Sequence, residues 1–151
     1  MDREPNPSRI TGGRLKQRPP VILVVDDNED NRDLYAMALG RAGYVVAVAV
    51  DGLDAVAKAE AIGPVLILMD LAMPNLDGWE ATKRIRALPE LAPDLQIIAL
   101  TAFTDAVSIQ RALAAGCNAA LAKPCPPQVL LEHIATALAP RPVAGTARET
   151  A

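Results

Sequence analysis

Five consecutive apolar residues, Val65–Met69, lie between Gly63-Pro64 and Asp70, and this run strongly limits how the chain can fold. The run is too short for a helix core and is typical of a strand buried on both faces of a parallel sheet. Asp70 then stands at the carboxyl end of a central strand, where open α/β sheets place their chemistry. The turn residues of Met73–Gly78 predict a loop after it, so Asp70 is expected at the mouth of a crevice.

Other strand-like runs alternate with helical patterns along the chain. These runs are Val21–Val25, Val45–Val50, Ile97–Leu100 and Ala119–Ala122. Repeated strand-then-helix units predict one parallel sheet with right-handed crossovers and helices on both faces. In such a sheet, every loop that follows a strand opens at the same edge.

Apolar residues at helical spacing predict five helices. The residues expected to mark them are Leu34, Met37 and Ala38 in the first helix, Leu53, Val56 and Ala57 in the second, Trp79, Thr82 and Ile85 in the third, Val107 and Leu113 in the fourth, and Val129, Leu130, His133, Ile134 and Leu138 in the fifth. Helix ends are expected at Gly43, Gly63, Pro89 and Gly116, and a helix start at Pro126-Pro127.

The length of 151 residues suits one domain, and the longest apolar runs fall far short of the about 20 residues that cross a membrane. Residues 1–19 and 140–151 lack apolar periodicity, which predicts disordered tails around a folded domain at residues 20–139. About a dozen residues after the last helix are too few for an output domain. The polar N-terminus has no signal core, so a cytoplasmic location is expected.

Charge is distributed unevenly along the chain. Residues 1–20 carry five basic and two acidic side chains, whereas residues 21–139 carry eight basic and fifteen acidic ones. An acidic body argues against nucleic-acid binding. Cys117 and Cys125 are expected to be reduced thiols, and with His133 as the sole histidine they form no zinc motif.

Polar side chains follow four of the predicted strands, and the topology brings them to one edge. They are Asp26 and Asp27 after the first strand, Asp70 after the third, Thr101 after the fourth and Lys123 after the fifth. Clustered carboxylates repel one another unless a cation compensates, and Mg²⁺ takes oxygen ligands while leaving positions for phosphate. A carboxylate nucleophile, Mg²⁺, a lysine and a hydroxyl form a set suited to phosphoryl transfer.

Four motifs in register give the chain a resemblance to response-regulator receiver domains of two-component signalling, of the single-domain chemotaxis-regulator type. They are Val24–Asn28 with its Asp-Asp pair, Asp70–Gly78, Leu100–Ala102 and Lys123-Pro124. The match spans Val21 to about Ala139. It implies a flavodoxin-like α/β fold, a three-layer sandwich with a doubly wound five-stranded parallel sheet and five helices.

The resemblance implies that Asp70 accepts a phosphoryl group from a histidine kinase or a histidine phosphotransfer protein. The implied ligands of Mg²⁺ (or Mn²⁺) are Asp27, Asp70 and the main-chain carbonyl of Ala72, with Asp26 assisting through water. The domain would then be a phosphoprotein that catalyses only its own phosphorylation and dephosphorylation. As a monomer or weak dimer, it would signal through protein contact.

Further roles follow from the same resemblance. Lys123 would pair with the phosphoryl oxygens, and Thr101 would move to hydrogen-bond them, passing the change to the face of the fourth helix, the Ala119–Ala122 strand and the fifth helix. That face is the expected surface for a downstream protein. Gly78 would permit a close turn, and the bond before Pro124 would be cis.

Three positions depart from the family's familiar pattern. Ala120 stands where an aromatic switch residue is frequent, which argues against coupling through an aromatic flip there. Phe103 is the nearest aromatic candidate, with a packing role as the alternative. Ala72 and Phe103 occupy positions that influence dephosphorylation, and neither side chain can orient water, so slow self-hydrolysis is expected.

Plainer interpretations stand beside this one. Asp26 and Asp27 are alternatively helix caps, Asp77 is expected in a turn rather than as a ligand, and His133 is expected in packing or at the surface. A receiver-fold scaffold that is never phosphorylated is the competing function, and the acidic set with Thr101 and Lys123 argues against it. A receiver segment of a larger hybrid kinase is the other architecture.

Overall fold

The computed structural model describes residues 19–91 and 93–140. The tails expected at residues 1–19 and 140–151 lie outside this part, apart from residues 19 and 140, and the domain limits of 20–139 stay a prediction. Within the described ranges, none of the helices has both the length and the apolar character needed to cross a membrane.

A five-stranded parallel sheet in the order β2-β1-β3-β4-β5 forms the centre of the described part. Its strands are β1 (Val21–Val25), β2 (Val45–Ala49), β3 (Leu66–Asp70), β4 (Gln96–Thr101) and β5 (Ala119–Ala122). The helices are α2 (Glu29–Arg41), α3 (Gly52–Ile62), α4 (Gly78–Arg86), α5 (Ala106–Ala115) and α6 (Pro127–Leu138). The order confirms the predicted flavodoxin-like doubly wound fold, with strand limits within one residue of those expected.

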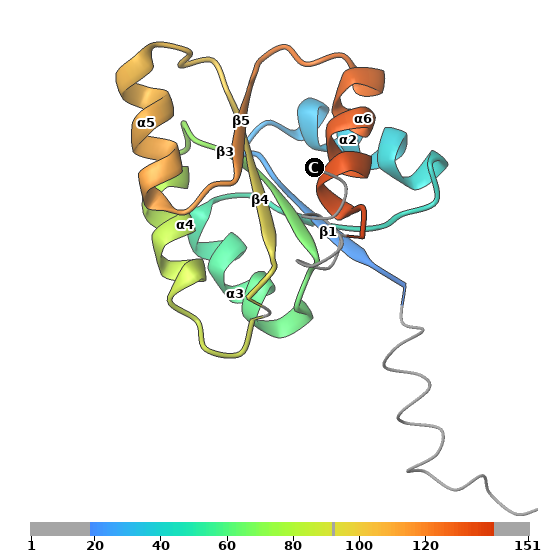
Figure 1. The fold of residues 1–151 in the computed structure, drawn as a ribbon, viewed down its shortest axis with the longest axis horizontal. Helices are drawn as coiled ribbons and strands as arrows, with labels where there is room; N and C mark the ends of the chain where they lie inside the picture. The colour runs from blue at the N-terminus through green and yellow to red at the C-terminus, as the bar shows by residue number, and fades with distance from the viewer. Residues whose placement is uncertain (1–18, 92, 141–151) are drawn as a thin grey trace, which may run out of the picture.

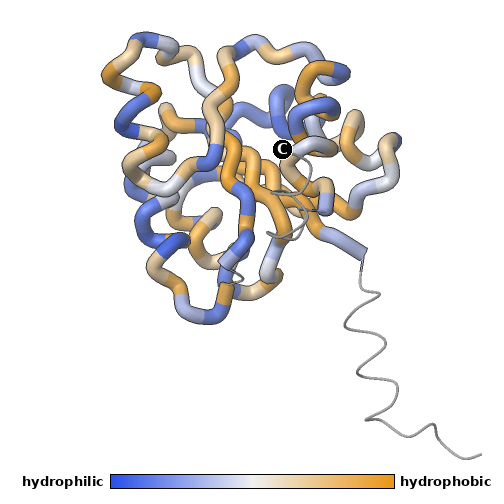
Figure 2. The backbone as a smooth tube through the Cα atoms, viewed as in Figure 1, coloured by the Kyte–Doolittle hydropathy of each residue, from blue (hydrophilic) through white to orange (hydrophobic). Residues whose placement is uncertain are grey.

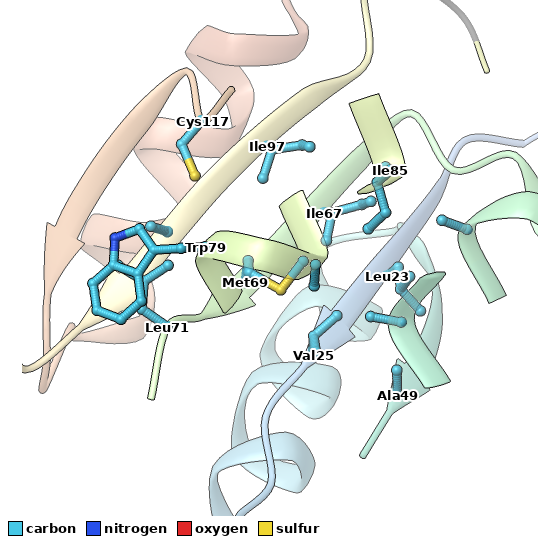
Figure 3. Packing of buried hydrophobic residues seen from close by; sticks show 14 of the residues in the cluster. Leu23, Val25, Ala49, Ile67, Met69, Leu71, Trp79, Ile85, Ile97 and Cys117 are labelled. Atoms are coloured by element: carbon cyan, nitrogen blue, oxygen red, sulfur yellow. The ribbon is translucent and has the colours of Figure 1, made fainter. Parts of the chain in front are cut away.

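Helices cover both faces of the sheet, with α2 and α6 on one side and α3, α4 and α5 on the other (Figure 1). The strands form the hydrophobic interior between these layers (Figure 2). Alternate strand residues face opposite layers: Leu23, Ile67 and Ile97 belong to the cluster beneath α3, α4 and α5 (Figure 3). Ile22 and Leu66 belong to the cluster beneath α2 and α6. Because successive strand residues face opposite sides of the sheet, the domain has two separate hydrophobic cores.

Some predicted helix faces are correct. Trp79, Thr82 and Ile85 are buried in α4, and Leu130 and Ile134 are buried in α6. The α6 helix begins after Pro126, as predicted, and α3 ends at Gly63 in the left-handed conformation with φ 66°. Proline fits in the first turn of a helix, and glycine readily adopts a positive φ at the carboxyl end of a helix.

Other predicted helix faces are wrong. In α2 the buried residues are Tyr35 and Leu39, while Leu34 and Met37 are exposed. The α2 sequence has two sets of apolar residues at helical spacing. The set that contains the aromatic residue Tyr35 faces the sheet. Gly43 follows the C-cap Ala42 rather than forming the cap itself.

The helices α3 and α5 bury alanines where larger residues were expected to mark the inner face. Ala55 and Ala59 are buried in α3 while Leu53 is exposed. In α5, the buried residues are Ala112 and Ala115, and Val107 is 76% exposed. Leu113 of α5, and Val129 and His133 of α6, are also exposed. Small side chains let a helix approach a sheet closely, which a search for large apolar residues overlooks.

Aspartate and asparagine side chains begin four of the helices. The N-caps are Asn28 for α2, Asp51 for α3, Asp77 for α4 and Asp105 for α5, and each side chain accepts a main-chain N–H of the first turn. Asp77 is therefore a cap, not only a turn residue. Because Asn28 caps α2, Asp26 and Asp27 are left free of the capping role.

Candidate functional site

Three carboxylates meet at the carboxyl edge of the sheet. Asp26 and Asp27 follow β1, and Asp70 ends the adjacent strand β3. One carboxylate oxygen from each of the three lies within 4.8 Å of the others. Asp26 and Asp70 are buried, whereas Asp27 is exposed. Strand pairing thus assembles the acidic group that the sequence predicts.

Lys123 enters this acidic group from the loop after β5. Its Nζ lies 2.8 Å from Oδ2 of Asp26 and 3.5 Å from Oδ2 of Asp70. The Lys123 main-chain N–H donates to the carbonyl of Thr101 at 2.9 Å, which fixes the loop against β4. The peptide bond from Lys123 to Pro124 is cis, as the resemblance implied. The lysine thus lies beside both buried carboxylates.

A network that the sequence analysis missed holds Asp26 in place. Oδ1 of Asp26 accepts the Asn28 N–H at 2.9 Å, and the Asn31 amide lies 3.5 Å from Oδ2. Arg32 donates to the Asp26 carbonyl at 2.8 Å. These residues lie in the cap and first turn of α2, so their spacing after Asp26 was the available signal. The helix start therefore orients the carboxylate.

The main chain packs tightly around Asp70. Its Oδ1 accepts the Ala72 N–H at 3.2 Å, and the Gly78 N–H donates to the Leu71 carbonyl at 3.0 Å. A Cβ at Gly78 would overlap the carbonyl of Asp70. The glycine therefore permits the close turn that was predicted, and α4 begins directly against the site.

Burial raises the pKa of Asp70 from 3.8 to about 6, while Lys123 and the Ala72 N–H act in the opposite direction. The charges of Asp26 and Asp27 add to the rise. Burial lowers the pKa of Lys123, yet its hydrogen bond to Asp26 and the charges of Asp70 and Asp26 leave that pKa above its usual value. Burial therefore dominates the shift of Asp70, and the single charge of Lys123 stands beside three carboxylates.

The oxygen donors suit a divalent cation. Mg²⁺ binds through one or two carboxylates and keeps further positions for water and phosphate oxygen. Asp26, Asp27 and Asp70 supply the carboxylates, and burial, with smaller contributions from the charges of Asp26 and Asp27, raises the pKa of Asp70. Ala72 is next to this group through its N–H contact with Asp70. A bound cation would thus offset the repulsion.

Thr101 lies at the end of β4 and is buried. Its Oγ1 accepts the N–H of Phe103 at 2.8 Å. Ala120 is half-buried in the middle of β5 and packs against the core beneath α5. The threonine is therefore tied to the loop that carries Phe103, and β5 offers only a methyl group at position 120.

The remaining candidates make none of the hydrogen bonds or ion pairs described above for the acidic group. His133 is exposed on α6. Cys117 and Cys125 are buried and free, and burial raises the pKa of both thiols. Thr82 lies 3.8 Å from the Cys117 sulfur, consistent with a packing role. His133 thus lies at the surface, one of the positions expected for it, and the reduced state of the thiols stays a prediction.

Comparisons with known proteins agree with this arrangement. The family model for the response regulator receiver domain matches residues 22–135. An uncharacterized 14.6 kDa protein of Leptolyngbya boryana is 42% identical over 113 residues, covering 75% of this chain and 86% of the relative. The sensor histidine kinase RcsC of Salmonella typhimurium is 39% identical over 115 residues, covering 76% of this chain. This chain spans only 12% of that kinase's length.

Solved structures show the same fold. The chemotaxis protein CheY4 of Vibrio cholerae has a TM-score of 0.75 at 32% identity, covering 80% of this chain and 99% of its own. The receiver domain of a Pseudomonas aeruginosa sensor histidine kinase has a TM-score of 0.72 at 38% identity, covering 78% and 96%. That structure holds a magnesium ion in its active site cleft. This chain belongs to the response regulator receiver domain family.

Proposed function

We propose that Asp70 accepts a phosphoryl group from the phosphohistidine of a histidine kinase or a histidine phosphotransfer protein. The observation that carries this proposal is the position of Lys123, whose Nζ lies 3.5 Å from the Asp70 carboxylate beside two further aspartates. A buried acceptor, a cation and a metal-binding acidic pair are the parts that phosphoryl transfer needs. The domain is a phosphoacceptor signalling module rather than a classical enzyme.

In the transfer, a carboxylate oxygen of Asp70 forms a bond to phosphorus while the phosphorus–nitrogen bond of the donor breaks. The electron pair of that bond leaves with the imidazole. With a pKa of about 6, Asp70 is mostly ionised at neutral pH and so can act as the nucleophile. Lys123 neutralises the phosphoryl oxygens, and the Thr101 hydroxyl donates to one of them. Positioning and charge supply the catalysis.

The residues that would hold Mg²⁺ (or Mn²⁺) are Asp26, Asp27 and Asp70, with the main-chain carbonyl of Ala72. When bound, the ion supplies positive charge to the phosphoryl oxygens. The N–H of the α2 N-cap residue Asn28 and the Nζ of Lys123 both hydrogen-bond the Asp26 carboxylate, so it stays oriented for this role. Asp27 is exposed, so the donor can approach the acidic group from its side.

The output is proposed to be a protein contact on the face of α5, β5 and α6, with no nucleic acid or membrane involved. Thr101 connects the acceptor site to this side of the sheet, because β4 pairs directly with β5. We place the reaction in the cytosol and expect a monomer or a weak dimer. A receiver domain would accept the phosphoryl group in the same way as a stand-alone regulator or as a segment of a hybrid kinase.

Intact mass spectrometry after incubation with acetyl phosphate tests the proposal. The wild type should gain one phosphoryl group with Mg²⁺ and none with a chelator, and Asp70→Asn should gain none. Asp77→Asn is the matched control, since it changes a nearby helix cap and should keep the adduct. Folded wild-type protein that gains no adduct under any condition would contradict the proposal and favour the scaffold function.

A further inference from the structure

Three side chains form a stack that joins the loop after β4 to α4 and α5. The rings of Phe103 and Trp79 are nearly parallel, with centroids 5.9 Å apart and planes at 24°. The Arg111 guanidinium lies 4.1 Å from the centroid of the Trp79 ring. Trp79 is in the first turn of α4 and Arg111 in the middle of α5, two helices that lie side by side (Figure 1). The stack therefore connects the loop to both helices.

One hydrogen bond ties this stack to the candidate site. The Phe103 N–H donates to Oγ1 of Thr101 at 2.8 Å, and Thr101 is 1% exposed at the end of β4. A threonine side chain occupies a few discrete rotamers rather than a continuum. Rotation to a different rotamer therefore carries Oγ1 away from the Phe103 N–H.

The two rings differ in how firmly they are held. Trp79 is 8% exposed and belongs to the core that includes Met69, Leu71 and Cys117 (Figure 3). Its Nε1 donates to the Ser108 carbonyl of α5 at 3.5 Å, a long hydrogen bond. Phe103 is 41% exposed. Phe103 is thus the ring that can move into water while Trp79 stays in place.

We infer that phosphorylation of Asp70 is passed to α4 and α5 by release of Phe103 from Trp79. This inference rests on the proposed function, in which the Thr101 hydroxyl donates to the added phosphoryl group. Turning toward that group takes Oγ1 away from Phe103, whose N–H loses its acceptor, and the ring leaves the stack. Trp79 then keeps its contacts with Arg111 and Ser108 of α5, but the Phe103 ring no longer covers the indole. In β5, the methyl side chain of Ala120 provides no competing aromatic contact.

Tryptophan fluorescence follows this change directly because Trp79 is the chain's single tryptophan. Treatment with acetyl phosphate and Mg²⁺ should shift the emission to the red and increase quenching by acrylamide. Intact mass of the same samples gives the fraction modified, so each change is expressed per modified molecule. Phe103→Leu keeps apolar volume but removes the ring. In this variant the change in Trp79 emission and quenching on modification should be largely lost.

Variants of Thr101 separate this relay from a direct effect of the new charge on Trp79. Thr101→Val removes the hydroxyl and keeps the side-chain shape, so quenching should be high before treatment and unchanged by modification. Thr101→Ser keeps the hydroxyl and should restore the response. Val107→Ala alters an exposed apolar residue at the start of α5 and serves as the control with a wild-type response.

The outcomes distinguish the inference from the proposed function. A wild-type protein that carries the adduct with unchanged Trp79 quenching overturns the relay and leaves the phosphoacceptor function standing. Thr101→Val with a wild-type response per modified molecule also overturns the relay. A wild-type protein that forms no adduct removes both. Adduct formation, a wild-type response and its loss in Thr101→Val and Phe103→Leu support both.

Discussion

Asp70, the proposed phosphoryl acceptor, is a buried residue whose ionised form destabilises the fold. Burial raises its pKa to about 6 from 3.8, so the folded state retains the Asp70 proton at pH values where the unfolded chain has lost it. The contribution of Asp70 to stability is therefore most favourable below about pH 4 and is lost as the pH rises toward the folded pKa. Above that pH, the ionised carboxylate opposes folding.

Asp70→Asn should therefore stabilise the metal-free protein at neutral pH. The rise in pKa from 3.8 to about 6 corresponds to at most about 3 kcal/mol in the free energy of unfolding. The measurement is urea denaturation at pH 7.5 and pH 5 with a chelator, and the gain should be smaller at pH 5. Mg²⁺ should stabilise the wild type more than the variant, because the ion binds the folded site. An Asp70→Asn protein that is less stable than wild type at pH 7.5 would contradict this account.

Individual residues beside Asp70 also bear on the lifetime of the proposed phosphoryl adduct. Ala72 lies against Asp70 through its N–H, and neither its methyl group nor the Phe103 ring can position a water for attack. We expect the adduct to persist for many minutes in Mg²⁺ buffer after the donor is removed. Ala72→Asn, which adds a polar group beside the acceptor, should shorten this lifetime several-fold. Radiolabel loss or intact mass against time measures it, and a wild-type lifetime of seconds would contradict the prediction.

At the scale of elements, helix caps determine how the site loops are held. Asp77 accepts the Glu80 N–H at 2.9 Å and begins α4 directly beside the acceptor loop. Asp51 is the corresponding N-cap of α3 and accepts the Asp54 N–H at 2.8 Å. Both side chains satisfy a main-chain donor that the helix leaves unpaired.

Asp77→Ala should lower the free energy of unfolding by about 1 kcal/mol and keep the Mg²⁺-dependent adduct. Asp51→Ala removes an equivalent cap on a neighbouring helix and should cost a similar amount. Chemical denaturation with intact mass on the same samples checks both effects. Loss of the adduct in a folded Asp77→Ala protein would instead place Asp77 in the site.

The sequence predicts the elements better than it predicts their inner faces. Strand positions follow from short apolar runs, and the polar residues at the strand ends converge because parallel topology requires it. The buried faces of α2 and α5 were wrong because Leu34 and Val107 are large and apolar yet lie outward, while Tyr35 and Ala112 face the sheet. Which set packs inward depends on the space left by strands far along the chain.

The finer parts of the site escaped prediction for the same reason. Nothing local in the sequence shows that Phe103, Trp79 and Arg111 stack, since the contact joins a loop and two helices. The support of Asp26 by Asn28 and Arg32 was within reach of the sequence, because these residues begin the helix that follows it. The contacts that escape prediction are therefore those between side chains far apart in the sequence.

At the scale of the whole molecule, the sheet separates two hydrophobic cores. Ile85 belongs to the core beneath α3, α4 and α5, whereas Ile134 belongs to the core beneath α2 and α6. Both side chains are fully buried. Since the sheet lies between them, changes in one core are expected to leave the packing of the other intact.

Ile85→Val and Ile134→Val should each cost about 0.5–1.5 kcal/mol of unfolding free energy. The double variant should lose the sum of the two to within about 0.5 kcal/mol, because the residues share no contacts across the sheet. Urea denaturation of the three variants completes the double-mutant cycle. A larger departure from additivity would show that the two cores respond as one.

The identity of the phosphorylated residue tests the central claim most directly. Protein treated with acetyl phosphate and Mg²⁺ is reduced with borohydride, which converts an aspartyl phosphate into homoserine, and is then digested with trypsin. Cleavage after Lys58 and Lys83 separates Asp70 from Asp26 and Asp27. The account predicts Mg²⁺-dependent homoserine at position 70 alone. Homoserine at Asp26, Asp27 or Asp77, or at no position in folded protein, would contradict it.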